Sequence, residues 1–219
     1  PKNMMNSIKH LITLTTALAL LPACSKTTDS ASNSPSEIET KVSVSDSAIG
    51  SIGPVVDDFS DPTKNSLGID RQFIDDSATG GGTKAQHSVK KGVLSTKGEL
   101  SPPRGQPAWA STVLLLNPEG FPQDTSAYQG IRLLVRVNQG DLSVSVNSSE
   151  IENFDYHATM VTSQSDGQFH EVKIPFTQLK RAWSAQTQLN TKTVTSLSLV
   201  AFGVQKKPFD FEFDEIGFY

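Results

Sequence analysis

Apolar and polar residues alternate along several short runs of the chain. In residues 142–148, Leu142, Val144 and Val146 fall on one face, and two serines and an asparagine fall on the other. Residues 131–137 alternate in the same way, with Arg132 and Arg136 on the polar side. Because successive side chains of a strand point to opposite faces, each run predicts a β-strand with one face toward a core and one toward solvent or ligand.

Similar runs recur about every ten residues from residue 54 onward, separated by glycines, prolines and short polar segments. This spacing predicts an all-β sandwich, and no stretch after residue 24 has the period of a long helix. In the last run, phenylalanines alternate from 209 to 213, and the apolar positions then move to 216 and 218. That change of phase predicts a β-bulge at Asp214 and Glu215.

The N-terminal segment has a different pattern. Lys9 and His10 precede an apolar run over residues 11–21, and Pro22 and Ala23 separate that run from Cys24, the only cysteine of the chain. This layout predicts a secretory signal peptide over residues 1–23, because the run is too short to span a bilayer comfortably. The tetrapeptide LPAC also resembles the lipobox of bacterial lipoproteins, in which the cysteine thiol becomes diacylglyceryl-modified. An ordinary signal with a coincidental cysteine is the alternative.

Residues 25–53 are rich in Ser, Thr, Asp, Asn and Ala and contain no aromatic residue. Such a segment cannot bury enough apolar area to offset the entropy of ordering it. We therefore expect residues 24–53 to be a flexible linker between a lipidated Cys24 and a folded domain over residues 54–219. Two or three acyl chains, including palmitate, would hold the protein on a membrane.

Charge and motifs exclude two classes of function. The net charge is −4, and no basic cluster is interleaved with aromatic residues, so we expect no nucleic acid as a partner. Beyond the signal, the histidines are His87, His157 and His170, and none has metal-ligand spacing to another His, Cys or acid. No nucleophile elbow or zinc-protease motif occurs. We therefore expect no enzyme.

Four segments, in order, resemble the complex-I-intermediate-associated protein family. VVDDF at residues 55–59 fits the start of that domain, and DTSAYQGIRLLVR at residues 124–136 resembles its D-x-S-x-Y-x-G-I strand entry. FHEVKIPFTQL, from residue 169, resembles its W-x-x-V-x-I-P-F-x-x-F segment, and FDFEFDEIGFY, from residue 209, resembles its terminal strand. The same features are similar to family-eleven carbohydrate-binding modules. The resemblance implies a galactose-binding-domain-like jelly-roll β-sandwich over residues 54–219.

The resemblance also gives a reason why the alternating run that begins at residue 169 ends abruptly. It implies that residues 169–174 form a strand whose ladder ends at Pro175, because proline lacks the N–H for the next rung. Phe176 is expected to pack into the edge of the sandwich. From the sequence pattern alone, residues 177–183 are compatible with one helical turn.

A structural calcium ion is a further implication. Jelly-roll modules of this type often hold Ca²⁺ between the first strand and the last. Here Asp57 or Asp58 would meet Asp214 or Glu215, whose hard oxygen atoms suit that ion. Solvated acids at strand ends, balanced by nearby lysines, are the alternative.

A sugar site needs flat aromatic side chains that stack on pyranose faces and polar groups that bind hydroxyls. The candidate aromatics are Trp183, Tyr128, Tyr156 and Trp109, and the candidate polar residues are Arg132, Arg136, Ser143, Ser145 and Asn147. The alternatives are that Trp109 and Tyr156 pack in the core or at an edge, that Trp183 caps the sandwich, and that the arginines form a solvated stripe.

Two hypotheses for function follow. In the first, a non-catalytic envelope lipoprotein binds a carbohydrate through its β-sandwich. In the second, the domain is a protein-interaction or assembly factor of the complex-I-intermediate-associated type, with an envelope protein as its partner. Three or more aromatics on one concave face would favour sugar, and a flat apolar patch without convergent polar groups would favour protein. The residue after Cys24 is Ser25, whereas the inner-membrane retention signal of enterobacterial lipoproteins has an acidic residue at this position. We therefore expect the protein in the outer membrane if the source has two membranes.

Overall fold

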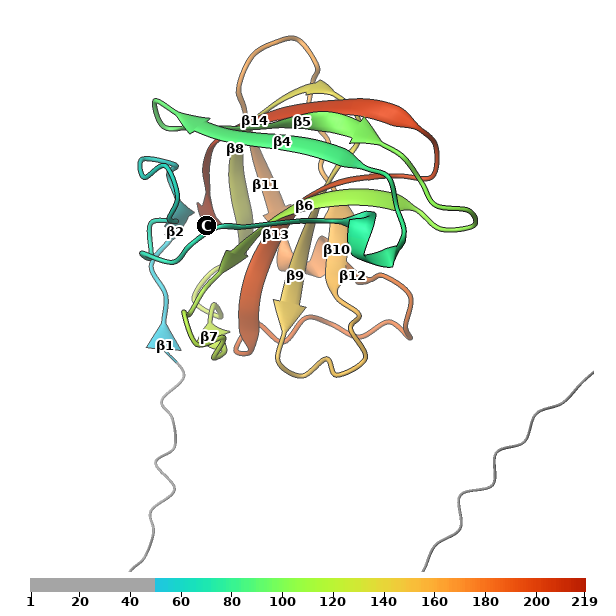
Figure 1. Ribbon diagram of the computed structural model, residues 1–219. Coiled ribbons are helices and arrows are strands. Elements are labelled where there is room, and N and C mark those ends of the chain that lie inside the picture. Colours follow the sequence, from blue (N-terminus) through green and yellow to red (C-terminus); the bar gives the residue numbers. More distant parts are fainter. Residues whose placement is uncertain (1–49) are drawn as a thin grey trace, which may run out of the picture. The chain divides into compact units, whose positions relative to one another are not determined.

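Two β-sheets pack face to face in the computed structural model, which describes residues 50–219 (Figure 1). The expected signal peptide, Cys24 and most of the expected linker lie outside the described residues and stay predictions. Among residues 50–219, no helix is long and apolar enough to cross a membrane.

The first sheet, sheet A, has eight strands. They are β1 (Gly50–Ser51), β3 (Gln72–Asp75), β6 (Ala108–Leu115), β7 (Gln123–Asp124), β9 (Leu142–Ser148), β10 (His157–Met160), β12 (Lys180–Arg181) and β13 (Val194–Gly203). The main order is β3–β6–β13–β9–β10–β12, with antiparallel pairing throughout. The short strand β7 also pairs with β13, and β1 runs parallel to β7.

The second sheet, sheet B, has six strands. They are β2 (Val55–Asp57), β4 (Lys84–Lys90), β5 (Val93–Leu100), β8 (Gly130–Gln139), β11 (His170–Pro175) and β14 (Lys207–Phe218). The order is β11–β8–β14–β5–β4, and β2 pairs with the C-terminal part of β14. Two 3₁₀ helices, η1 (Asp76–Thr79) and η2 (Phe176–Gln178), lie in the connections.

The core lies between the sheets and follows the alternation in the sequence. The apolar positions of β8, β9 and β14 that the pattern placed on one face are all buried. The register of β14 against β8 shifts between Phe213 and Glu215, which confirms the predicted bulge. Because of this shift, both Phe213 and Ile216 reach the core with no measurable exposure.

The chain crosses from one sheet to the other at Gly140. This residue follows β8 of sheet B, precedes β9 of sheet A and has a φ of +91°. A Cβ atom here would lie 2.8 Å from the Cβ of Phe209, so the tight crossing requires glycine. As a result, the polar face of β9 and the arginine face of β8 point out of opposite sides of the sandwich.

The strand before Pro175 ends as expected. β11 stops at Pro175, and Phe176, only 9% exposed, packs on Phe218 with ring centroids 6.2 Å apart. The expected helical turn over residues 177–183 is wrong in extent, because only Phe176–Gln178 is helical. Lys180 and Arg181 instead pair with β10, which gives their backbone groups hydrogen-bond partners at the edge of sheet A.

The ordered sandwich begins before Pro54, the expected boundary. Gly50 and Ser51 pair with β7, and the carbonyl oxygen of Ile52 accepts a hydrogen bond of 2.8 Å from the Tyr128 hydroxyl. Ile52 also packs against the core. Residues 50–53 therefore belong to the sandwich and not to the expected linker.

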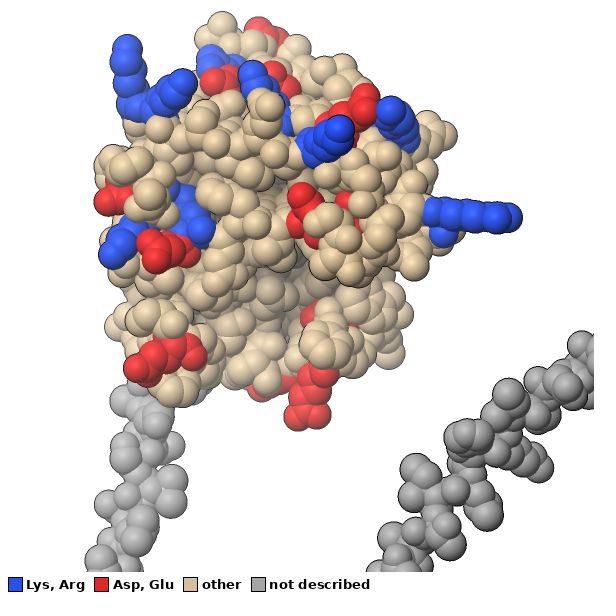
Figure 2. Space-filling model, viewed as in Figure 1, with Lys and Arg blue, Asp and Glu red and all other residues tan. Residues whose placement is uncertain are grey.

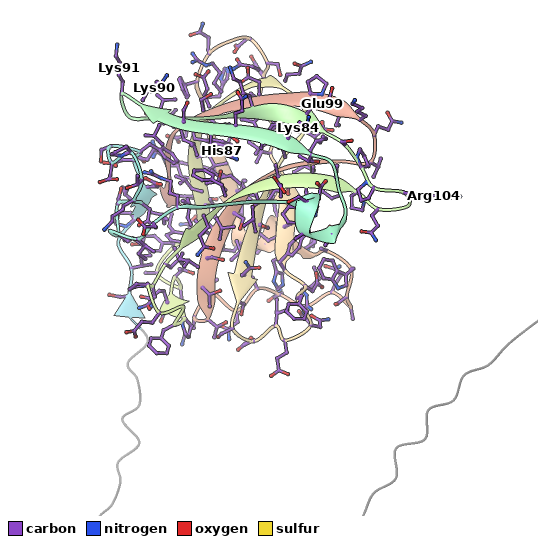
Figure 3. The ribbon with its side chains drawn as sticks, in the orientation of Figure 1. Lys84, His87, Lys90, Lys91, Glu99 and Arg104 are labelled. Atoms are coloured by element: carbon purple, nitrogen blue, oxygen red, sulfur yellow. The ribbon has the colours of Figure 1, made fainter. Side chains whose placement is uncertain are left out.

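The strand β4 forms one edge of sheet B and carries charge along its outer side. Lys84 and Lys90 are exposed on this strand, and Lys91 in the following turn points away from the molecule (Figure 3). Lysines on an exposed edge oppose pairing with a strand of another molecule. His87 of the same strand faces the other way, where its ring stacks on Phe73 with centroids 4.1 Å apart.

Candidate ligand-binding groove

A row of hydroxyl groups crosses the outer face of sheet A. Ser198 of β13 lies opposite Ser145 of β9, and Ser196 lies opposite Asn147. The Asn147 amide donates a 2.9 Å hydrogen bond to the Ser196 hydroxyl. This face therefore carries neutral polar groups at the centre of the sheet, where the strands on both sides hold the backbone in place.

The face is hollowed into a continuous groove. A cavity of about 580 Å³ lies over β6, β13 and β9, and a second of about 250 Å³ continues toward β10 and β12. Ser145, Tyr156, Val200 and Phe202 line both cavities. We call the two together the sheet A groove. Figure 2 shows the molecule hollowed in the region that β9 and β13 occupy in Figure 1, with lysines and arginines toward the margins of the view.

Aromatic side chains form the walls of the groove. Those that line it are Trp109, Phe154, Tyr156, Trp183 and Phe202. Trp183 is 60% exposed and meets the half-buried Tyr156 edge-to-face, with centroids 5.3 Å apart and an interplanar angle of 86°. Phe154 is 91% exposed and has a φ of +61°. A bulky residue rarely adopts positive φ, so the backbone at Phe154 is in an unusual conformation beside the groove.

A buried carboxylate fixes the two loops that carry these rings. Asp155 is 3% exposed and accepts hydrogen bonds from the backbone N–H groups of Tyr156 (2.8 Å), Ala182 (3.0 Å) and Ser184 (3.0 Å). The Arg181 guanidinium donates a fourth, at 2.9 Å. Asp155 thus joins the loop before β10 to the loop after β12, and this positions Tyr156 against Trp183.

The charge states of these groups follow from their surroundings. Burial by itself raises the pKa of Asp155, but the hydrogen bonds from Ser184, Tyr156 and Arg181 outweigh burial and hold the pKa well below its usual range. Burial, helped by the nearby charge of Asp155, raises the pKa of Tyr156. The Tyr156 hydroxyl therefore stays protonated at neutral pH and can both donate and accept a hydrogen bond.

A second buried carboxylate holds the opposite wall. Asp76, at the start of η1, has no measurable exposure and accepts hydrogen bonds from the backbone N–H and hydroxyl of Thr83, at 3.2 and 2.7 Å. It also accepts a 3.1 Å hydrogen bond from the backbone N–H of Trp109. The glycine-rich loop after η1 and the start of β6 are thereby tied together beside Trp109.

The structure brings most of the aromatic and hydroxyl candidates from the sequence into one place. Trp109, Tyr156, Trp183 and Asn147 all line the larger cavity, although two strands and two loops supply them. Ser145 lines both cavities and Ser143 lines the smaller one. The arrangement meets the criterion of three or more aromatics on one concave face.

Three expected ligand residues lie elsewhere. Tyr128 stacks on Phe218 and donates its hydroxyl to Ile52, so it packs the sandwich. Arg132 and Arg136 project from sheet B, on the side of the sandwich opposite the groove. Their assignment to the same site as Trp183 is wrong, because the chain crosses between sheets after β8.

Both arginines are held by carboxylates. Arg132 pairs with Glu171 and Glu215, and Arg136 pairs with Glu212 and lies over the ring of Phe169 at 4.5 Å. The alternative interpretation, a solvated stripe of ion pairs, therefore describes these arginines.

The acids expected to bind calcium are not gathered into a site. Asp57 is fully buried, and both of its oxygens accept hydrogen bonds from the Arg71 guanidinium, at 2.5 and 2.9 Å. Asp58 is exposed and accepts from Ser60 and Ser66, whereas Glu215 pairs with Arg132. Asp214 lies at the bulge of β14. Among residues 50–219, no group of three or more His, Cys, Asp or Glu side chains is placed to hold a metal.

Sequence reasoning missed Phe154, Phe202 and Asp155. Phe154 stands between Asn153 and Asp155 in a polar loop, which is the same signal that singled out Trp183. Phe202 shares the outward alternation of β13 with Ser198 and Val200. The role of Asp155 left no such signal, because its partners Arg181, Ala182 and Ser184 lie 26 to 29 residues further along the chain.

Comparison with solved structures shows the fold. The family 11 carbohydrate-binding module from Clostridium thermocellum, in complex with a beta-1,3-1,4-mixed-linked tetrasaccharide, matches with a TM-score of 0.55 and 16% identity, over 75% of this chain and 94% of that one. The family 11 module of the cellulosomal cellulase Lic26A-Cel5E of the same organism matches with a TM-score of 0.55 and 16% identity, over 78% and 95% of the two chains. The agarase AgWH50C matches with a TM-score of 0.51 and 9% identity, over 74% of this chain and 24% of the enzyme.

Sequence comparison shows the family. Among curated proteins no sequence matches this chain. The family model for Complex I intermediate-associated protein 30 matches residues 58–213, which is most of the sandwich and more than half of the whole sequence. The chain therefore belongs to the Complex I intermediate-associated protein 30 (CIA30) family.

Proposed function

We propose that this protein is a non-catalytic binding protein whose sheet A groove holds a carbohydrate chain. The observation that carries the proposal is the combination of aromatic walls with a neutral hydroxyl floor in one groove. A sugar ring offers an apolar face to an aromatic side chain and hydroxyls to polar groups at its rim. Two family 11 carbohydrate-binding modules share this fold, one of them in complex with a tetrasaccharide, and this supports the proposal.

The chemistry of the lining favours binding over cleavage. Glycoside hydrolysis ordinarily uses two carboxyl groups on either side of the scissile bond. Among the described residues that line the groove, Asp155 is the only acid. Its carboxylate accepts four hydrogen bonds and its pKa is well below the usual range, so it is a poor proton donor.

A glycan array probed with the purified full-length protein tests the proposal. Trp183→Ala removes one exposed wall of the groove, and Phe121→Ala is its matched control, because Phe121 is 54% exposed and does not line the groove. Burial of an aromatic side chain contributes ~1.5–3 kcal/mol, so Trp183→Ala should weaken binding by roughly 10- to 150-fold. The control should bind as the natural protein does.

Two results would count against the proposal. If a folded protein bound no glycan on the array, a protein partner of the groove would be the better interpretation, and cross-linking in the envelope would be the next search. If Trp183→Ala and Phe121→Ala weakened binding equally, the site would lie outside the groove.

We extend the proposal to the N-terminal part of the chain. Lipid on Cys24 would hold the domain at the cell envelope, on the outer membrane where the source has two membranes, with residues 25–49 as the connecting segment. The sequence around LPAC supports this. Labelled palmitate should enter the natural protein and not Cys24→Ser, and the variant should leave the membrane fraction. Equal labelling of both proteins would contradict it.

A further inference from the structure

The end of the groove over β10 and β12 differs in chemistry from the rest. The 250 Å³ cavity there is lined by the apolar side chains of Ala158, Met160, Ala182, Val200 and Phe202, together with Tyr156. Met160, the last residue of β10, is 50% exposed. Ala158, Met160, Ala182 and Val200 offer no partners for hydroxyls, so the hydroxyl groups of a bare sugar would gain little beside them. We call this end the Met160 subsite.

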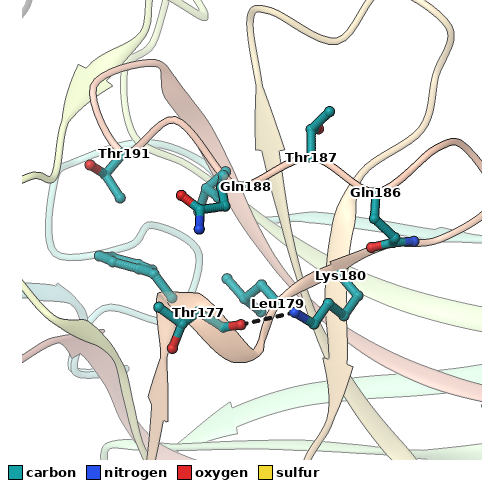
Figure 4. A pocket seen from close by; sticks show the side chains of 9 residues that line it. Thr177, Leu179, Lys180, Gln186, Thr187, Gln188 and Thr191 are labelled. Carbon is teal, nitrogen blue, oxygen red and sulfur yellow. Dashed lines mark hydrogen bonds between the residues drawn. The ribbon is translucent and has the colours of Figure 1, made fainter.

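The two cations in the lining turn their charges away from it. Lys180 also lines a separate cavity of about 280 Å³, and its ammonium group donates to the carbonyl oxygen of Thr177 at 3.3 Å (Figure 4). The Arg181 guanidinium donates to Asp155 at 2.9 Å and to the Thr187 hydroxyl at 3.2 Å. These residues therefore contribute their aliphatic stems to the Met160 subsite.

Some hydroxyl groups of the Met160 subsite already make hydrogen bonds within the protein, and others do not. Ser143 donates its hydroxyl to the carbonyl oxygen of Thr159 at 3.1 Å. Ser145 lines both cavities and is 6% exposed, and its hydroxyl makes no hydrogen bond to any of residues 50–219. The Ser145 hydroxyl thus lies at the border between the aromatic part of the groove and the apolar subsite, and the hydroxyls of Tyr156 and Thr159 also line the subsite.

We propose that the Met160 subsite recognises an acetyl group carried by the bound glycan, as an ester or an amide. The methyl group would lie among Met160, Val200 and Phe202, and the carbonyl oxygen would accept a hydrogen bond from Ser145. An acetyl group matches a mainly apolar lining with a hydroxyl donor at its border, whereas a hydroxyl placed among Met160, Val200 and Phe202 would lose water without a partner. The inference rests on the proposed function, because the subsite continues the glycan groove.

Chitotetraose and cellotetraose test this inference, because they share a β-1,4 backbone and differ in the acetamido group. Calorimetric titration of the full-length protein should give binding of chitotetraose on the order of tenfold tighter. Met160→Gln and Ser145→Ala should each weaken binding of chitotetraose more than binding of cellotetraose, and so reduce that ratio severalfold. Val204→Gln, at an exposed apolar residue that does not line the groove, is the matched control for Met160→Gln and should keep the ratio.

The outcomes separate this inference from the proposed function. Trp183→Ala should weaken both oligosaccharides by the same factor, because it acts on the shared backbone. Equal affinity of the natural protein for the two would overturn the acetyl subsite and leave the glycan groove standing. If Met160→Gln and Ser145→Ala kept the natural ratio of the two affinities, acetyl recognition would lie elsewhere and its assignment to the Met160 subsite would be overturned. If the protein bound neither oligosaccharide, no O-acetylated xylan or mannan oligosaccharide and no glycan on the array, both proposals would be overturned.

Discussion

Asp155→Asn should destabilise the protein far more than its position in a loop suggests. The side chains of Asp155 and Arg181 are 0% and 12% exposed, so the change leaves a nearly buried guanidinium without its counter-ion. Removal of one partner of a buried ion pair costs ~3–5 kcal/mol. Arg181 keeps its hydrogen bonds to Asn153 and Thr187 and a little contact with water, so the lower end, about 3 kcal/mol, is expected.

Urea unfolding followed by far-ultraviolet circular dichroism measures this loss. The midpoint should fall while the denaturant slope stays the same, because the sandwich core is unchanged. Asp166→Asn is the control, because Asp166 is exposed and its partners Gln168 and His170 belong to the same short segment. A loss of less than about 1 kcal/mol for Asp155→Asn would refute the role given to this carboxylate.

The pH dependence of the stability difference between the natural protein and Asp155→Asn checks the direction of the Asp155 pKa shift independently. The pKa of Asp155 is lowered in the folded state from its ordinary value of 3.8, so its contribution to stability is fully present above that value. The contribution disappears only as pH falls through the folded-state pKa. The difference in stability between the natural protein and Asp155→Asn should therefore stay constant from pH 7 to pH 5. A difference that shrinks over that range would contradict the assignment.

Three further predictions concern other buried groups. Asp76→Asn disturbs the hydrogen bond to the Trp109 backbone and should cost ~1–3 kcal/mol in urea unfolding; a loss within error would contradict the assigned role. Burial lowers the pKa of His87 from its ordinary value of 6.5, and the charge of Asp75 partly opposes this. The stability that neutral His87 confers is therefore present above pH 6.5 and is lost as pH falls below that value. The melting temperature should therefore fall from pH 7 to pH 5, and less steeply in His87→Gln; equal slopes would contradict this. Because Arg71 already neutralises Asp57, addition of a chelator should leave the melting temperature unchanged, and a drop of several degrees would restore the calcium hypothesis.

The sequence predicts the strands well because each strand has one apolar face. The alternation of Leu142, Val144 and Val146 is enough to place β9, and the change of phase after Phe213 is enough to place a bulge. Local pattern decides these features, because a one-residue slip would move the whole apolar face out of the core.

The site is less predictable because it depends on which sheet each strand joins. The serines of β9 and the arginines of β8 look equally suited to a ligand, yet Gly140 sends them to opposite sides of the sandwich. Alternation gives the face of a strand but not the sheet. The Asp155 hydrogen bonds that join two loops depend on pairing of β10 with β12, which no local pattern shows.

The measurement that tests the central claim most directly is a heteronuclear NMR titration of the protein with the tightest oligosaccharide from the array. The account predicts shift changes at the Trp183 indole and at the amides of Ser145 and Ser198, which line the groove. Amides next to Arg132 and Arg136 on sheet B should not move. Shift changes confined to sheet B would contradict the claim that the outer face of sheet A is the binding surface.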